Sequence, residues 1–176
     1  MILLAIDPGP ERSAWVQYNL TTGGIDGAGL QNVPNLSLAY NITQWMGDHV
    51  AIEGVQNMGM PAVGSALFNT AFWAGGFAIA AESMGWPVFY PQDVEQRAHT
   101  VVYRKDIKLH LCGSLRAKDA NVRQALIDRF PATGGGKVPQ VGTKKKPGPL
   151  YGIKSHLWSA LAVAVYWADT HEENEL

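Results

Sequence analysis

The sequence of 176 residues is poor in cysteine and has no long apolar run suited to a membrane. Its one cysteine, Cys112, excludes an internal disulfide framework and suits a reducing compartment. The apolar run at residues 2–6 is too short for a signal peptide, and a charged residue follows it at once. Residues 54–81 carry no charge, but Ser65 and Asn69 make a buried helix a better interpretation than a membrane span. We therefore expect one soluble domain.

Positive charge is scarce outside one segment of the chain. Although the formal net charge is −1, residues 97–154 hold thirteen of the fourteen Lys and Arg residues against three Asp residues, which makes this segment +10. Residues 1–96 and 155–176 are correspondingly acidic. Such segregation predicts that an anionic polymer binds to one face of the protein. The alternative is a basic surface that contacts only solvent.

Two apolar segments each end in a carboxylate, and this pairing is the most informative feature of the chain. Asp7 follows the run at residues 2–6, and Glu53 follows the run at residues 49–52. A carboxylate at the tip of a buried strand is costly unless a positive charge compensates it, and two such tips can lie side by side in one sheet. Either residue alone would more often belong to a turn, because Asp7-Pro8-Gly9 is ordinary turn chemistry. Together they predict a Mg²⁺ site.

The apolar periodicity predicts the first half of an α/β fold. Strands are expected at residues 2–6, 13–20 and 27–33 as an antiparallel meander, then a helix at residues 35–48 and a strand at residues 49–53 parallel to the first. Asn35 is the expected cap of that helix. Its apolar face would be formed by Leu36, Ala39, Ile42 and Met46.

The second half is expected to consist mainly of helices. The pattern predicts a helix within residues 61–84, covered by its own sheet on one side and with a second subunit as the candidate cover for the other. A strand at residues 86–90 follows, with helices at residues 91–99, 119–130 and 155–167 and a Gly/Pro/Lys-rich loop at residues 133–149. Ser155 is the expected cap of the last helix. The resulting sheet is five-stranded and mixed, an antiparallel meander plus parallel strands, with helices flanking it.

In this order and spacing, the chain resembles the RuvC-like Holliday junction resolvases of the ribonuclease H-like superfamily, phage members in particular. The resemblance spans most of the chain and rests on residues 2–9, 51–53, 65–67, 87–89, 118–125 and 155–164. It implies a ribonuclease H-like fold, with a nuclease domain at residues 1–170 and an acidic tail at residues 171–176.

The resemblance also implies an activity, that of a structure-selective endodeoxyribonuclease with two Mg²⁺ ions per active site, for which Mn²⁺ can substitute. One ion would activate a water molecule and the other would stabilise the leaving 3′ oxygen, so that hydrolysis leaves a 5′-phosphate. A homodimer would cut two strands of a Holliday junction symmetrically, and forks or flaps are further candidate substrates. The expected location is the cytoplasm of a bacterium or of a phage-infected host. The alternative is a relative that binds branched DNA without cutting it.

The metal ligands implied by the resemblance are Asp7, Glu53, His156 and Ser159. Ser159 is a departure, because cellular members of the family have an Asp at this position, and a hydroxyl lacks the charge of a carboxylate. The site could belong to a variant that still cuts, to an inactive relative, or to a deliberately disabled protein, and we favour the first. Asp169 cannot easily replace Ser159, since it lies about 20 Å beyond His156 along a helix. Without the resemblance, His156 would be interpreted as a residue of the turn that opens the helix.

The basic residues divide into one catalytic candidate and a larger set of DNA contacts. Lys118 matches a position that stabilises charge at the scissile phosphate in the family, and the alternative is a solvated lysine. The residues expected to contact the phosphate backbone, Lys118 among them, are Arg104, Lys105, Lys108, Arg116, Lys118, Lys144, Lys145 and Lys146. Met58 and Met60, in the loop after Glu53, are candidate apolar wedges for an opened junction, and they are equally well explained as ordinary loop residues.

Overall fold

The computed structural model describes residues 1–30, 34–56, 64–85 and 101–171. Several predicted features lie outside these ranges. They are the end of the third strand at residues 31–33, the wedge candidates Met58 and Met60, the strand at residues 86–90, the helix at residues 91–99, and residues 172–176 of the acidic tail.

One five-stranded sheet, in the order β3-β2-β1-β4-β5, organises the molecule. The strands are β1 (Ile2–Asp7), β2 (Ala14–Asn19), β3 (Gly24–Leu30), β4 (His49–Gly54) and β5 (Val101–Tyr103). The first three form the predicted antiparallel meander, and β4 and β5 add parallel to β1 and β4. The mixed five-stranded sheet is thus confirmed. Strand β3 begins three residues earlier than predicted, and the sequence analysis did not assign β5 to a strand.

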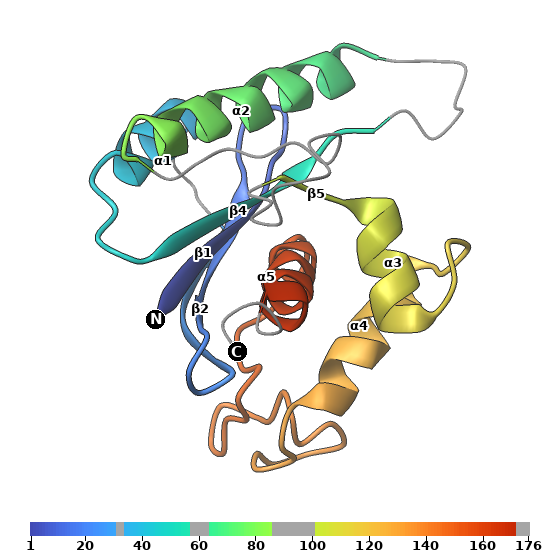
Figure 1. Cartoon of the computed structure of the whole chain (residues 1–176). Coiled ribbons are helices and arrows are strands. Elements are labelled where there is room, and N and C mark those ends of the chain that lie inside the picture. Colours follow the sequence, from blue (N-terminus) through green and yellow to red (C-terminus); the bar gives the residue numbers. More distant parts are fainter. Residues whose placement is uncertain (31–33, 57–63, 86–100, 172–176) are drawn as a thin grey trace.

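Helices cover both faces of this sheet (Figure 1). Helices α1 (Asn35–Ile42) and α2 (Ser65–Glu82) lie on one face, and α5 (Leu157–His171) lies on the other, with α3 (Arg104–Cys112) and α4 (Asp119–Arg129) beside it. Alternation along the strands builds two cores, because Leu4 and Ile6 pack towards α1 and α2, whereas Leu3 and Ala5 pack towards α5. No helix in the described ranges is both long and apolar enough to span a membrane.

The predicted apolar face of α1 is confirmed at Ala39 and Ile42 and wrong at Leu36 and Met46, and the predicted length is wrong. Leu38 and Ile42 are buried, whereas Leu36 and Met46 are 69% and 94% exposed. The inward row of α1 begins with a polar residue, Asn35, which is fully buried and does not cap the helix. The helix ends at Ile42 rather than at residue 48, because the chain must then reach the beginning of β4.

The last helix begins two residues later than predicted. Ser155 has a positive φ of 47° and precedes the helix instead of capping it, so the first residue of α5 is Leu157. The chain thus turns sharply at Ser155, and His156 lies in the turn that leads into the helix.

Helix α2 is buried on one side only in the single chain. Phe77, Ala78 and Ala81 pack against the sheet and α1. Phe68, Phe72 and Ile79 are each about two-thirds exposed or more. The outer side of this helix, whose one charged residue is Glu82 at its end, is therefore an exposed apolar surface.

Candidate functional site

Three charged side chains follow three neighbouring parallel strands. Asp7 is the last residue of β1, Glu53 is the penultimate residue of β4, and Arg104 directly follows β5. The register pairs Ile6 with Ile52, and Glu53 with Val102. Because the carboxyl ends of parallel strands meet at one edge of a sheet, these three residues converge there.

The alternation of the strands decides which way the two carboxylates point. Leu3 and Ala5 of β1, and Ala51 of β4, belong to the core formed with α5. Successive side chains of a strand point to opposite faces, so Asp7 and Glu53 lie on the same face as these residues. Both carboxylates are therefore directed towards the side of the sheet that carries the beginning of α5.

The beginning of α5 contributes an imidazole and a hydroxyl to the site. His156 Nδ1 lies 3.2 Å from Asp7 Oδ2. Ser159 is in the first turn of the helix, three residues later and on the same side, and its Oγ accepts a hydrogen bond of 3.1 Å from Arg104 Nη2. The four side chains proposed as metal ligands thus surround one small region.

The guanidinium of Arg104 contacts two of these four side chains, Glu53 and Ser159. Its Nε lies 3.4 Å from Glu53 Oε1, and its Nη1 donates to Glu53 Oε2 at 3.4 Å, so it faces both oxygens of the carboxylate. Its Nη2 also lies 3.6 Å from Asp119 Oδ1, at the beginning of α4. The exposed fraction of the side chain is 13% for Glu53 and 80% for Asp119, so the contact with Glu53 is far better shielded from solvent.

The electrostatics of the site favour a further positive charge. Burial, and then the nearby charge of Asp7, raise the pKa of Glu53 to about 8, and the cation of Arg104 only partly offsets these effects. A hydrogen bond with Asp7 raises the pKa of His156 above its ordinary value. A cation bound beside Glu53 would oppose the effect of burial and favour its ionised form.

Gly54 allows β5 to approach β4 closely. A Cβ at this position would lie 2.6 Å from side-chain atoms of Val101 and of Tyr103. A larger residue would therefore push β5 outwards. Since Arg104 directly follows β5, the glycine after Glu53 is what lets the guanidinium reach that carboxylate.

A buried polar contact fixes the turn that follows Asp7. Asn35 Nδ2 donates to the carbonyl oxygen of Gly9 at 2.9 Å, and Ser13 Oγ donates to Asn35 Oδ1 at 2.9 Å. Ser13 and Asn35 are both fully buried. Gly9 has no room for a side chain, because a Cβ there would clash with the carbonyl oxygen of Arg12. The turn is thereby held in one conformation, which positions Asp7.

Sequence reasoning missed the roles of Arg104 and Asp119 here. Arg104 was expected only to contact the DNA backbone, yet its guanidinium lies among the proposed metal ligands. Asp119 was expected only to begin the helix at residues 119–130. The basic character of Arg104 was visible in the sequence, but its contact with Glu53 spans 51 residues and has no local signal. Asp169 is not in the site, since it bonds His110 and Arg129.

The donor set fits one divalent ion. Carboxylate oxygens from Asp7 and Glu53 are ordinary ligands for Mg²⁺ or Mn²⁺, whereas the imidazole nitrogen of His156 is a softer donor, more typical of transition metals than of Mg²⁺. In the conformation described, no group of three or more His, Cys, Asp or Glu side chains within the described ranges is close enough to hold an ion. Glu53 instead pairs with Arg104, which also bonds Ser159. The residues thus fit one ion, provided that Glu53 adjusts its position, and they leave few ligands for a second.

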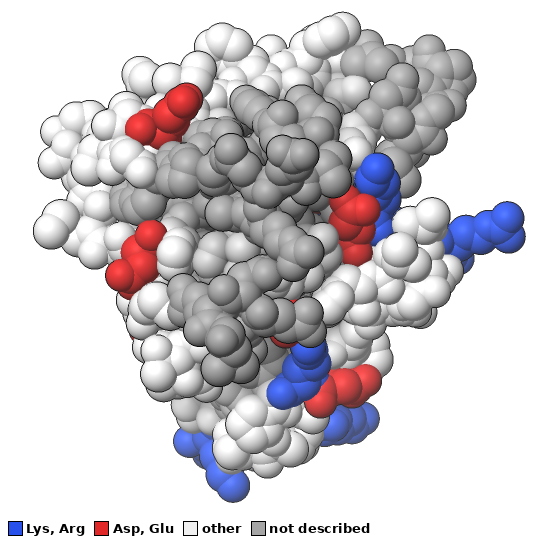
Figure 2. Space-filling view, viewed as in Figure 1, with Lys and Arg blue, Asp and Glu red and all other residues white. Residues whose placement is uncertain are grey.

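The remaining predicted cations lie in α3, just before α4 and in the loop between α4 and α5. Figure 2 shows Lys and Arg atoms over the part of the view that α3, α4 and the loop after α4 occupy in Figure 1. Lys105, Arg116, Lys118 and the three lysines at residues 144–146 are exposed, and Lys108 is half-buried. Lys118 immediately precedes α4, so it stands at a helix N-terminus as predicted, next to Asp119. Helices α1 and α2 contain no Lys or Arg.

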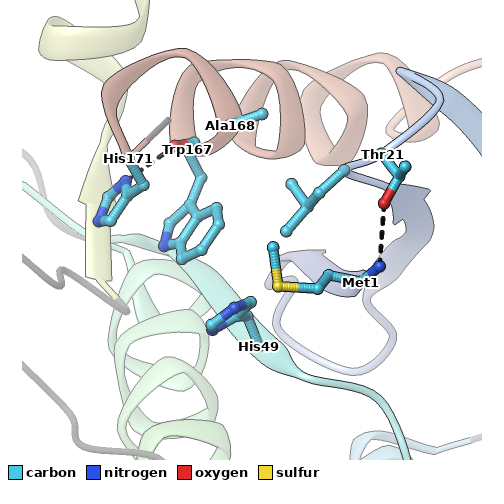
Figure 3. Close-up of a pocket in the computed structure, with 7 residues that line it drawn as sticks. Met1, Thr21, His49, Trp167, Ala168 and His171 are labelled. Atoms are coloured by element: carbon cyan, nitrogen blue, oxygen red, sulfur yellow. Dashed lines mark hydrogen bonds between the residues drawn. The ribbon is translucent and has the colours of Figure 1, made fainter. Parts of the chain in front are cut away.

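A small cavity of about 90 Å³ lies at the other end of the sheet (Figure 3). It is lined by Met1, Leu20, Thr21, His49, Trp167, Ala168 and His171. The ring of Trp167 lies between those of His49 and His171, with centroid distances of 4.7 Å and 4.1 Å. Because Met1 directly precedes β1 and His49 begins β4, this cavity is remote from the carboxylates at the ends of these strands, and it is not part of the candidate site.

Comparison with known proteins identifies the fold. No protein-family model matches this chain, and no curated protein sequence matches it. The structure of Thermus thermophilus RuvC is similar, with a TM-score of 0.55 and 18% identity over 98% of this chain and 96% of that one. Thermus thermophilus RuvC in complex with a Holliday junction substrate gives a TM-score of 0.58 and 19% identity over 94% and 92%. The chain therefore has the ribonuclease H-like fold of RuvC, as predicted.

Proposed function

We propose that this chain is a metal-dependent, structure-selective endodeoxyribonuclease that resolves branched DNA, with the Holliday junction as its main substrate. The observation that carries the proposal is the convergence of Asp7, Glu53 and His156 at one sheet edge, on a chain with the fold of RuvC. One of the similar RuvC structures contains a Holliday junction substrate, which supports branched DNA as the ligand. Such an enzyme would act in the cytoplasm of a bacterium or of a phage-infected host.

The carboxylates and the imidazole have distinct parts in this proposal. Asp7 and Glu53 would hold Mg²⁺, or Mn²⁺ in its place, and His156 would bind through a neutral imidazole nitrogen. A bound ion supplies positive charge at the phosphate and favours deprotonation of water near neutral pH. Glu53 would then be ionised despite its burial, because a cation nearby opposes the effect that burial has on its pKa. In-line attack on phosphorus would break the bond to the 3′ oxygen and leave a 5′-phosphate.

The basic side of the molecule would hold the DNA backbone. Lys118 lies at the N-terminus of α4, where backbone N–H groups and the helix dipole favour a phosphate. The exposed lysines at residues 144–146 lie in the loop between α4 and α5, and they would contact phosphates further along an arm of the junction. These contacts position the DNA and carry no sequence information themselves.

A homodimer would place two such sites on one junction. Helix α2 exposes Phe68, Phe72 and Ile79, and a groove of about 750 Å³ between α1 and α2 is lined in part by Leu36, Tyr40 and Ile79. Apolar surface of this extent favours burial against a partner. A second copy of the chain, related by a two-fold axis, would cover it and account for paired symmetric cuts.

The second candidate function is junction binding without cleavage. Two observations favour it, namely that Ser159 provides no carboxylate and that Arg104 pairs with Glu53. A site kept only for binding would retain the basic residues at residues 144–146 but would not need the two strand-end carboxylates. Cleavage is preferred because both carboxylates are present and the turn after Asp7 is firmly held.

One assay distinguishes the two functions. A four-way junction labelled on each strand in turn is incubated with the protein and Mg²⁺ or Mn²⁺, beside a linear duplex of the same sequence as a control. The proposal expects cuts at symmetric positions on two strands of the junction only, with ends that DNA ligase can reseal because they carry 5′-phosphates. Retention of the junction without any cut under either metal would favour the binding function instead.

A further inference from the structure

Arg104 makes all of its contacts in the candidate site with acidic or hydroxyl oxygens. The guanidinium faces both oxygens of Glu53 at 3.4 Å and donates to Ser159 Oγ at 3.1 Å. It links α3 to β4 and α5, and through the longer contact with Asp119 to α4. Because the side chain is 27% exposed, the guanidinium is enclosed on the protein side yet accessible to a ligand.

The formal charges show how many divalent ions the site can balance. With Asp7 and Glu53 ionised, His156 neutral and Arg104 charged, the inner site carries a charge of −1. One divalent ion and one phosphodiester bring the total to zero, whereas two ions would leave an excess of two positive charges in a partly buried region. Asp119 adds a negative charge, but it is 80% exposed and strongly screened by solvent.

A serine at position 159 is compatible in charge and hydrogen bonding with the neighbouring guanidinium of Arg104. A serine hydroxyl accepts the hydrogen bond from Arg104 without adding charge. A carboxylate there would provide the ligand that a second ion needs, but this chain has none at that position. Ser159 and Arg104 together thus carry a charge of +1, the same as a carboxylate and a divalent ion would carry in their place.

The guanidinium also has room to bind a phosphate. Within the described part of the chain it donates hydrogen bonds to Glu53 and Ser159, and its Nε and Nη2 also lie 3.4 Å from Glu53 and 3.6 Å from the exposed Asp119, so these contacts engage at most four of its five N–H groups. A phosphate oxygen can bind the fifth N–H group and displace Asp119. Arginine side chains and metal ions serve equally as clamps on the oxygens of a reacting phosphate.

We infer that Arg104 is a catalytic residue that takes the place of a second metal ion, binding the scissile phosphate while it holds Glu53 and Ser159, so that each subunit takes one divalent ion. The inference rests on the proposed nuclease function and specifies its metal content. Arg104 would neutralise the charge that develops on the phosphate, and the single ion would be held by Asp7, Glu53 and His156.

The test counts Mn²⁺ ions bound by the metal-free full-length protein, through the loss of the electron paramagnetic resonance signal of free Mn²⁺ during a titration to saturation. Wild type is expected to bind one ion per subunit. Ser159→Asp alone should also bind one ion, because the new carboxylate pairs with Arg104. The double variant Arg104→Met/Ser159→Asp should bind two. Lys137→Met/Ser159→Asp, which removes an exposed cation of the loop at residues 133–149 instead, is the matched control and should bind one.

The possible outcomes separate this inference from the proposed function. Two ions bound by wild type, or one by the Arg104→Met/Ser159→Asp variant, would overturn the role of Arg104 while metal-dependent cleavage by wild type still stood. Absence of Mn²⁺ binding together with absence of cleavage would overturn both. If the Arg104→Met/Ser159→Asp variant unfolds at the temperature of the titration, Arg104→Gln/Ser159→Asp replaces it, because Gln retains hydrogen-bonding capacity. This variant is also expected to bind two ions. The dependence of the wild-type cleavage rate on Mg²⁺ concentration is a second readout. Its reaction order with respect to Mg²⁺ is expected to be one.

Discussion

His156 Nδ1 lies 3.2 Å from Asp7 Oδ2, across a sequence separation of 149 residues. This contact joins the end of the first strand to the beginning of the last helix. It also links the protonation of the imidazole to the charge of the carboxylate.

Cleavage is expected to depend steeply on pH. The hydrogen bond with Asp7 raises the pKa of His156, and burial raises that of Glu53 to about 8. Both groups must lose a proton to bind a metal, so at a fixed subsaturating Mg²⁺ concentration the rate should rise with pH through the histidine range and level off above about pH 8. Rates measured between about pH 5.5 and about pH 9.5 test this. At saturating Mg²⁺ the rise in rate should move to lower pH, because the ion competes with protons for the same ligands. A rate that does not change with pH at low Mg²⁺ would contradict the assignment of Glu53 and His156 as ligands.

Asn35→Ala should impair both stability and cleavage. The change removes the acceptor of the Ser13 hydroxyl and the side-chain donor to the carbonyl of Gly9, at a cost of about 1–3 kcal/mol. For a chain of this size, that corresponds to a fall in Tm of roughly 2–12 °C. Because the same contact holds the turn after Asp7, the cleavage rate should fall at temperatures where the variant is still folded. Asn41→Ala, in the same helix but on its exposed side, is the control and should behave like wild type.

Replacing Lys144, Lys145 and Lys146 together by Gln should weaken junction binding and its dependence on salt. For every lysine that no longer binds a phosphate, the slope of log affinity against log salt concentration should become shallower by about 0.9. Binding curves at several salt concentrations measure this slope. Lys137→Gln, in the same loop, serves as the control. An unchanged slope in the triple variant would show that residues 144–146 face away from the DNA.

Phe72→Glu should convert a dimer into monomers. Phe72 is 71% exposed in the single chain, at the centre of the apolar side of α2, and a carboxylate there would be buried without a partner in a two-fold interface. Sedimentation velocity gives the mass of the particle directly. Leu109→Glu, on the exposed side of α3, alters a comparably apolar position away from α2 and should leave the mass unchanged. A monomeric wild type would contradict the dimer proposal.

The two carboxylates at the strand ends could be predicted from the sequence, because the pattern that indicates them lies within a few consecutive residues. An apolar run that ends in Asp7 or Glu53 predicts both a strand and the position of its carboxylate, and the observed register agrees. His156 and Ser159 carry no such signal, since a histidine and a serine at the beginning of a helix are common. Only their match to the resolvase pattern singled them out.

The features that escaped prediction depend on contacts distant in sequence. Strand β5 has three residues, too few for any periodicity, and its position depends on Gly54 of the neighbouring strand. The position of Arg104 in turn depends on that of β5, which it directly follows. The inward face of α1 was partly misassigned because it begins with Asn35, a polar residue that is buried only because Gly9 and Ser13 bond its side chain.

The most direct test of the account measures cleavage and binding of the same four-way junction by wild type, Asp7→Asn and Glu53→Gln. Each substitution removes a metal-ligand charge but none of the lysines that hold the phosphate backbone. Wild type should therefore cut in Mg²⁺, and both variants should lose cleavage by at least about a hundredfold while their affinity for the junction stays within about threefold of wild type. Undiminished cutting by either variant, or a wild type that cuts nothing in Mg²⁺ or Mn²⁺, would contradict the assignment of the two strand-end carboxylates to a metal-dependent nuclease site.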